Sequence, residues 1–336
     1  PYYLGCLWYD KRQYDQAIAC WERSAELDET FPTVWRNLAL AYFNKRGEKE
    51  LARRCMEKAF ALDETDARVL LELDQLCRKL GRSVAQLLDA HRETAFRRDD
   101  LYVEYCTLLN LEGRYAEALE LIQAHHFHPW EGGEGKVATQ YAVALTQLGR
   151  QALEAGDAAG AKTLLERALA FPHNLGEGKL EGAKDNNIHY YLGLAERALG
   201  NEQAALHHLE MAAAGDQEPA GAMYYNDQPA DMILYQGLAN RALGREERAR
   251  SRFHKLISYG EKHYYDQVKI DYFAVSLPDL QLFDEDLTLR NRAHCEYLMA
   301  LGSYGLGDTE RAGKCYDAVL AIDCAHQGAI LHKQLL

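Results

Sequence analysis

Proline is scarce in this sequence, and long apolar runs are missing from it. Only seven of the 336 residues are proline, whereas alanine and leucine are plentiful, a combination that favours helices over strands. A membrane-spanning helix needs roughly 20 consecutive apolar residues, and no stretch of the sequence approaches that length. The composition therefore predicts a helical protein that does not cross a membrane.

Positive charge is also in short supply. The chain has 38 basic and 51 acidic residues, a net charge of −13, and we find no run rich in lysine and arginine. A phosphate backbone or an anionic membrane would be repelled by such a surface unless basic residues gathered on it. The sequence therefore predicts neither nucleic acid nor membrane as a partner.

No Cys-x-x-Cys pair occurs among the eight cysteines, which removes the usual signal for a zinc ribbon or a redox motif. Most of them lie among apolar residues at helical spacing, where a thiol behaves as a small hydrophobic group. Free buried thiols are typical of a reducing cytosol, so we expect a cytoplasmic protein. The chain begins at Pro1 inside a helical pattern without an initiator methionine, and we expect it to be part of a longer protein.

What the sequence does contain is an internal repeat. A glycine followed five residues later by an alanine recurs along the chain, at Gly47/Ala52, Gly113/Ala118, Gly156/Ala161, Gly200/Ala205, Gly244/Ala249 and Gly307/Ala312. The alanines Ala17, Ala52, Ala85 and Ala118 are separated by 35, 33 and 33 residues, and later steps are longer. Such a period indicates a stacked array of helix hairpins.

Each part of the repeat has a physical role. The glycine can adopt the left-handed conformation that ends the first helix of a hairpin. The alanine lets the second helix approach the first closely, and a bulky residue four positions later fills the groove between them. The bulky residues are Trp21, Met56, Ile122, Leu165, Leu209, Phe253 and Tyr316. The unit from Leu70 to Arg97 departs most from this pattern.

These residues resemble the tetratricopeptide repeat (TPR) family. The first two units show it best, in Leu4, Gly5 and Trp8 with Ala17 and Trp21, and in Trp35, Leu38, Ala39 and Tyr42 with Ala52, Met56 and Ala59. The resemblance implies an all-α fold, a right-handed α-α superhelical solenoid of about eight TPR-like hairpins with insertions. It also implies that first helices line a concave groove that holds peptides or partner segments.

We divide this continuous solenoid into four parts by how regular the repeat is. Regular hairpins occupy residues 1–125, lengthened hairpins residues 126–257, an irregular insertion residues 258–291, and a terminal hairpin with a capping helix residues 292–336. Pro278 forbids a simple helix through the insertion, so we expect Phe273, Leu280, Leu282 and Phe283 to form an extra turn packed on the groove wall.

Two insertions carry the same Gly-Glu-Gly-Lys motif, at residues 133–136 and 176–179, each before a first helix. The two loops should emerge on the same edge of the solenoid. Their glycines expose backbone N–H groups, and Glu and Lys add an acceptor and donors, which suits a polyol, a carboxylate or a partner's loop. Alternatively, Glu134, Lys136, Glu177 and Lys179 form a structural clasp between neighbouring hairpins. Both interpretations stay open.

Other polar and aromatic residues accompany these loops. His125, His126 and His128 lack the helix-spaced partners that a metal site would need, so no metal or other cofactor is expected. Tyrosine and tryptophan beside amide, acidic and histidine side chains suit sugar rings as well as peptides. The candidate ligand-binding residues are Trp130, Glu134, Lys136, Tyr141, Glu177, Lys179, Asn186, Asn187, His189, Tyr190 and Asp271.

The segments 127–136, 174–179, 186–189 and 272–279 carry a narrower resemblance, from about Leu101 onward, to bacterial proteins of the DUF5107 type. In those proteins a β-rich domain with an expected association to carbohydrate precedes a long TPR region. The resemblance implies that an upstream half would carry the main activity, and it transfers no catalytic residue.

Three functions follow from the sequence. The first is a binding module whose groove holds a polypeptide segment or the protein's own upstream domain. The second is a module that completes an oligosaccharide site with the two loops. The third is a free-standing enzyme using Glu134 or Glu177 as acid or base, although the sequence does not place the paired carboxylates that a glycosidase needs. The repeat and the lack of an assembled catalytic constellation favour the first.

Overall fold

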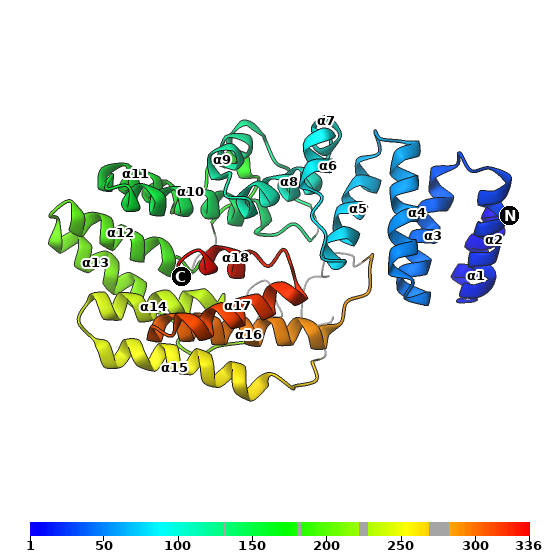
Figure 1. The fold of residues 1–336 in the computed structure, drawn as a ribbon. Helices are drawn as coiled ribbons and strands as arrows, with labels where there is room; N and C mark the ends of the chain where they lie inside the picture. Colours follow the sequence, from blue (N-terminus) through cyan, green and yellow to red (C-terminus); the bar gives the residue numbers. More distant parts are fainter. Residues whose placement is uncertain (131, 180–182, 222–227, 269–281) are drawn as a thin grey trace. The chain divides into compact units, whose positions relative to one another are not determined.

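The computed structural model describes the whole chain except residues 131, 180–182, 222–227 and 269–281 (Figure 1). The described residues form helices and no β-strand, which confirms the all-α prediction. Contacts between them divide the chain into two compact units. Unit 1 comprises residues 1–105 and 278–285, and unit 2 comprises residues 106–277 and 286–336.

Unit 1 consists of short hairpins. α1 pairs with α2 and α3 with α4, and α5 packs on α4. The π-helical turn η1 extends α3. The elements are α1 (Tyr2–Asp10), α2 (Tyr14–Leu27), α3 (Pro32–Ala41), η1 (Tyr42–Arg46), α4 (Lys49–Leu62), α5 (Ala67–Lys79), α6 (Ala85–Ala90) and α7 (Arg92–Ala95).

α8 (Asp99–Leu111) crosses the boundary between the units. In unit 2, α10 pairs with α11, α12 with α13, α14 with α15, and α16 with α17. The remaining elements are α9 (Tyr115–Ala124), α10 (Lys136–Glu154), α11 (Ala158–Ala168), η2 (His173–Leu175), α12 (Asn186–Ala198), α13 (Glu202–Ala213), α14 (Ala230–Ala242), α15 (Glu246–His263), α16 (Leu287–Leu306), α17 (Thr309–Ile322) and α18 (Gln327–Lys333).

The repeated glycines and alanines do what their spacing predicts. Gly47, Gly81 and the other repeat glycines have positive φ at the ends of first helices. The repeat alanines and the bulky residues four positions later are all buried. Gly237 shows how tight the packing is, because a Cβ built on it would lie 2.2 Å from the Phe253 ring. The hairpin interpretation of the repeat is therefore confirmed.

The third repeat is irregular, as its sequence indicates. Its second helix is broken into the short α6 and α7, which meet at His91. Ring contact between Phe60 and His91 and the hydrogen bond from Thr94 Oγ1 to the Glu64 carbonyl hold this broken segment against the preceding hairpin.

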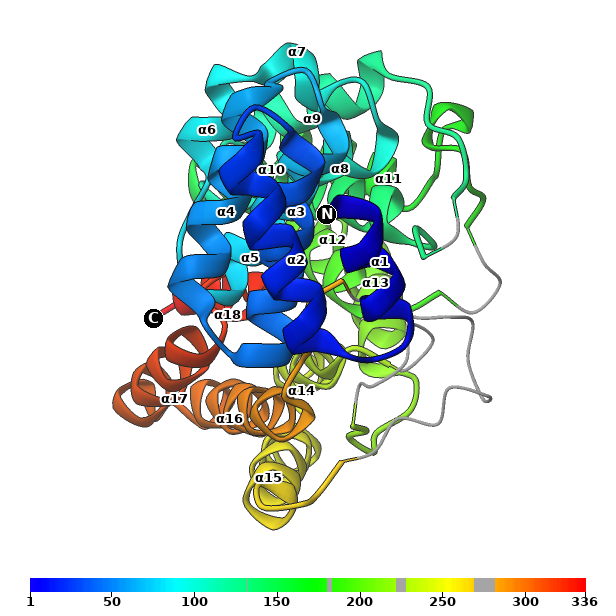
Figure 2. The ribbon, with the colours of Figure 1, turned by 90° about the vertical axis from the view of Figure 1, so that its right-hand side faces the viewer.

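First helices of neighbouring hairpins in unit 2 also contact one another, α10 with α12, α12 with α14, and α14 with α16. Figure 2 shows α14, α15 and α16 nearly end-on, with α15 outside the other two. First helices therefore line the inner side of unit 2, which is the arrangement expected of a solenoid.

Two further sequence-based expectations concern burial and membranes. Five of the eight cysteines, namely Cys55, Cys77, Cys106, Cys295 and Cys315, are buried thiols. Burial raises the pKa of Cys55 and Cys77 to about 11, so both are inert at neutral pH. None of the described helices combines the length and apolar character that a bilayer crossing requires.

Candidate functional site: two inner faces and a loop clasp

The two Gly-Glu-Gly-Lys loops contact each other; their positions in the repeat predict only that they emerge on the same edge. The Glu177 carboxylate accepts hydrogen bonds from the backbone N–H groups of Gly135 (2.8 Å) and Ala138 (3.0 Å). These groups belong to the first turn of α10, where four N–H groups have no partner inside the helix and the helix dipole favours an anion. Glu177 thus caps a 19-residue helix from the next loop along the chain.

Lys179 ties the same loop to the hairpin that follows. Its Nζ donates to the Leu169 carbonyl (2.9 Å) and forms an ion pair with Asp185 (2.6 Å), immediately before α12. The equivalent glutamate of the first motif, Glu134, is exposed to solvent instead. The glutamates of the two motifs, Glu134 and Glu177, therefore have different surroundings although the motifs have the same sequence.

A third contact closes the clasp. The Asn174 side chain donates to the carbonyls of Ile122 and His125, both 2.8 Å away, at the end of α9. The Phe127 N–H donates in turn to the Asn174 carbonyl (2.9 Å). Gly176 has φ +75°, and a Cβ on it would lie 2.5 Å from the Phe127 carbonyl oxygen, so this position needs glycine. The contacts of Glu177, Lys179 and Asn174 connect neighbouring hairpins. This is the structural role that the sequence gives as the alternative to ligand binding.

Other predicted ligand-binding residues are packed within the fold. The Trp130 ring covers Gly133, and a Cβ built on that glycine would lie 2.2 Å from the ring. Tyr141 is buried in α10. The Asn186 side chain donates to the carbonyls of Ala212 and Ala214, which ends α13. Asn187 and Lys136 are partly buried, and Asp271 lies outside the described residues.

His189 and Tyr190 belong to the α12–α13 interface. The His189 ring stacks on the His208 ring, and their Nδ1 atoms lie 3.1 Å apart. Burial and the neighbouring His208 lower the pKa of His189 to about 4, so both rings are neutral at pH 7. Tyr190 contacts Tyr191 and Tyr235, and burial raises the pKa of its hydroxyl. A role of these residues in binding a sugar or a peptide stays a prediction.

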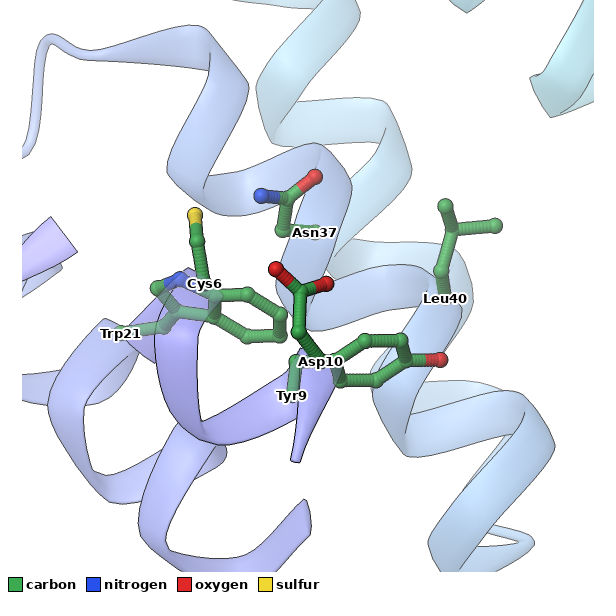
Figure 3. A pocket seen from close by; sticks show the side chains of 6 residues that line it. All are labelled: Cys6, Tyr9, Asp10, Trp21, Asn37 and Leu40. Atoms are coloured by element: carbon green, nitrogen blue, oxygen red, sulfur yellow. The ribbon is translucent and has the colours of Figure 1, made fainter. Parts of the chain in front are cut away.

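Unit 1 has a cavity on the face of its first helices. It measures about 190 Å³ and opens between α1 and α3, with α2 behind it (Figure 3). Apolar and polar side chains share its wall, namely Cys6, Tyr9, Asp10, Trp21, Asn37 and Leu40. Asn37 also donates to the Tyr2 hydroxyl (3.3 Å), which links the two helices beside the opening.

A segment of the same chain is seated next to this cavity. The Asn44 side chain donates to the Leu282 carbonyl (2.6 Å) and accepts from the Asp284 N–H (2.8 Å). One amide therefore pairs with the backbone on both sides of Phe283. The Phe283 ring is 1% exposed and packs edge-on against Phe43. For Phe283 the predicted packing of the insertion is thus observed, whereas Leu282 is placed by its backbone carbonyl only; Phe273 and Leu280 lie outside the described residues.

Leu40, Phe43 and Asn44 are spaced three and four residues apart, so they share one side of the α3–η1 helix. Burial raises the pKa of the Tyr9 hydroxyl, and the nearby Tyr14 and, to a smaller extent, Asp284 add to this. We call the surface made by Tyr9, Leu40, Phe43 and Asn44 the unit 1 docking face. Sequence reasoning missed Asn44, because nothing distinguishes one polar residue near a helix end from another.

The inner side of unit 2 is filled by the C-terminal helix α18 (Figure 1). Gln327 and Gln140 exchange side-chain hydrogen bonds, and Gln334 accepts from Arg150 (3.3 Å). On the opposite wall the Tyr297 hydroxyl lies 3.1 Å from His332 Nδ1. Helices α10 and α16, far apart in sequence, therefore both contact α18. The capping helix that the sequence predicts is α18, and it lies on the inner side of unit 2 in contact with α10 and α16.

Comparisons with known proteins found one family model and several solved structures that are similar to this chain. Residues 7–45 match the model of a TPR repeat. Among solved structures, the chain is similar to PilF of Pseudomonas aeruginosa (17% identity, covering 69% of this chain and 92% of that one, TM-score 0.37). It is also similar to the C-terminal part of a TPR repeat-containing protein from Cytophaga hutchinsonii (13% identity, 98% of both chains, TM-score 0.26). A further similar structure is YrrB, a TPR protein with an unusual peptide-binding site (17% identity, 76% of this chain and 100% of that one, TM-score 0.25). The TPR resemblance is thus supported, and the first hairpins carry the repeat that the family model describes.

Proposed function

We propose that this chain is a polypeptide-binding module and that the unit 1 docking face holds an extended segment in which an aromatic residue precedes an acidic one. The observation that carries the proposal is the seat of Leu282–Glu285 on that face. The segment contributes its own backbone, one buried ring and acidic side chains, and these are general features of a peptide rather than of a folded domain.

The contacts explain what such a face would recognise. Asn44 reads backbone groups only, so it fixes the position of an extended segment without selecting its sequence. Phe43 and the buried seat of Phe283 select an aromatic side chain. The next residues of the segment are Asp284 and Glu285, and Lys49, whose Nζ lies 5.9 Å from the centre of the Phe43 ring, can supply opposite charge.

The cavity beside the seat adds room for one more side chain. Its volume of about 190 Å³ lies between α1 and α3, and Asp284 of the resident segment approaches Tyr9 on its rim. A partner segment longer than the resident one would therefore gain contacts with Cys6, Trp21 and Leu40. Such a partner, from a separate protein or from another part of the same polypeptide, would replace residues 282–285.

Competition with the resident segment tests the proposal. Phe283→Ala frees the seat, and a synthetic peptide with the sequence of residues 279–287 should then bind in trans, as measured by fluorescence anisotropy. The same peptide with alanine in place of its phenylalanine is the matched control and should not bind. Adding Asn44→Ala to the Phe283→Ala chain should abolish binding, because both backbone hydrogen bonds are lost. Equal binding with and without Asn44 would refute the proposed seat.

A further inference from the structure

A second cavity lies in unit 2. It measures about 470 Å³ and lies among α13, α14 and the first turns of α15. Its wall is strongly polar and consists of Glu210, Ala213, Ala214, Gln217, Asn240, Arg245, Arg248 and Arg252. The three arginines are three and four residues apart, which places them on one side of the α15 helix.

Arg252 is held in place rather than mobile. Its residue is 8% exposed, and its Nε donates to Gln236 Oε1 (3.3 Å). Gln236 is itself anchored, because its Nε2 donates to the Asp216 carbonyl (2.7 Å). These bonds fix the guanidinium plane, and the two terminal nitrogens of Arg252 have no acceptor among the described residues.

The charges in the cavity do not cancel. Arg245 is paired with Glu210 through two hydrogen bonds, so these two charges neutralise each other. Glu218, another nearby acid, is paired with Lys255. Within the described part of the chain no carboxylate lies at ion-pairing distance from Arg248 or Arg252. Burial, and after it the neighbouring Arg248, lowers the pKa of Arg252, and Glu218 only partly opposes this.

We infer that this cavity binds the phosphate group of a phosphomonoester. Two guanidinium groups that form no ion pair with a described carboxylate match a phosphate group that carries about −1.5 to −2 charges at pH 7, and their planar forks can donate pairs of hydrogen bonds to its oxygens. The amides of Gln217 and Asn240 line the same space and can serve the remaining oxygens.

The sequence alone does not indicate this site. Arg245, Arg248, Arg250 and Arg252 are interrupted by two glutamates, an alanine and a serine, so no basic run appears in a chain with a net charge of −13. Only the helical period separates the three arginines that face the cavity from Arg250, which is exposed on α15 and does not line it.

Titration calorimetry in chloride buffer tests the inference with three probes: inorganic phosphate, a short peptide containing phosphoserine, and the same peptide without phosphate. Saturable binding of both phosphate-bearing probes would identify a general phosphate site. Binding of the phosphopeptide alone would identify a phosphorylated polypeptide as the ligand. Binding of neither, or equal binding of the unphosphorylated peptide, would overturn the inference.

Two arginines of one helix provide the matched variants. Arg248→Ala should weaken phosphate binding about tenfold, whereas Arg250→Ala, with the same change in net charge, should alter it by less than about twofold. Arg252→Lys keeps the charge but loses the fork and should also weaken binding, with folding checked by circular dichroism. Equal effects of Arg248→Ala and Arg250→Ala would show attraction to net charge alone and would refute a built site.

Discussion

The two units hold segments of their own chain in different ways. On the unit 1 docking face, residues 282–285 are held by one amide and one buried ring. In unit 2, α18 buries Ala329, Leu331 and His332 and bonds through Gln327 and Gln334 to α10. The first is a short irregular segment on the α3–η1 helix, and the second is a helix that contacts both α10 and α16.

This difference distinguishes a segment that a ligand can replace from one that is part of the folded core. A ligand can replace a resident segment only if the free energy that holds the segment is small compared with the affinity of the ligand. One amide and one ring hold residues 282–285, so a peptide of similar chemistry can compete with them. α18 shares the buried core of the last hairpins and should leave only when that core unfolds.

Removal of α18 should have the largest effect and tests this contrast directly. A chain ending at Cys324 loses three buried side chains and the hydrogen bonds that Gln140, Arg150 and Tyr297 form with Gln327, Gln334 and His332. We expect a loss of about 4 kcal/mol or more in the unfolding free energy of unit 2, with unit 1 unchanged. Hydrogen exchange read separately for the two units would measure it. Unchanged protection of α14 and α16 would show that α18 is a loosely held occupant like residues 282–285.

The second-largest effect is expected from substitutions of glycines at close helix contacts. In Gly237→Ala the added carbon must displace the Phe253 ring, whose nearest atom is 2.2 Å away, and a rigid buried ring cannot yield. We expect a cost of about 2 kcal/mol, confined to unit 2. Gly5→Ala should act likewise in unit 1, where Trp21 is 2.5 Å away.

Gly178→Ala is the control for these two substitutions, because nothing lies within 4 Å of its added carbon. It should leave thermal unfolding unchanged. If Gly5→Ala and Gly237→Ala each lowered the stability of both units equally, the units would unfold as one body and the contrast between them would fail.

Acid should affect the units in opposite directions. Burial raises the pKa of Asp74 in unit 1 to about 6, from an unfolded value of 3.8, so its folded form binds protons more tightly. Its contribution is present below pH 3.8 and is lost as pH rises through 6. Burial lowers the pKa of His189 in unit 2 from 6.5 to about 4, so its contribution is present above pH 6.5 and is lost as pH falls toward 4.

Between pH 6.5 and 4 we therefore expect unit 1 to gain on the order of 2 kcal/mol and unit 2 to lose on the order of 1 kcal/mol, the smaller figure allowing for solvent screening of His189. Urea unfolding of Asp74→Asn and His189→Gln across this range would assign each slope. If the unfolding free energy of a unit still changed with pH in its variant, other titratable groups would cause the change.

The sequence predicts the role of a residue when its partners lie in the same hairpin, and it does not when they lie far along the chain. The repeat predicts the helix-ending role of Gly47 and the burial of Ala52 and Met56, because neighbours in sequence decide them. Asn44 and Gln327 were not identified, because their partners lie 238 and 187 residues away. Periodicity gives no information about which distant segment an amide will meet. The ligand roles of Trp130, Glu134 and His189 stay predictions, because packing within the chain accounts for the positions of Trp130 and His189 without a ligand.

The smallest expected effect concerns the Gly-Glu-Gly-Lys clasp, which holds the start of α10 and so supports the wall against which Gln327 and Gln334 bind. Glu177→Ala removes the acceptor of the Gly135 and Ala138 N–H groups and should lower the stability of unit 2 by about 1 kcal/mol. Glu134→Ala changes the same letter of the other motif at an exposed position and should have no measurable effect. Thermal unfolding of the two variants, with and without a panel of oligosaccharides and the 279–287 peptide, separates the two open interpretations. A ligand that stabilises the parent chain but not Glu134→Ala would make the loop a binding site, whereas loss of stability in Glu177→Ala alone, without any ligand effect, would leave it a clasp.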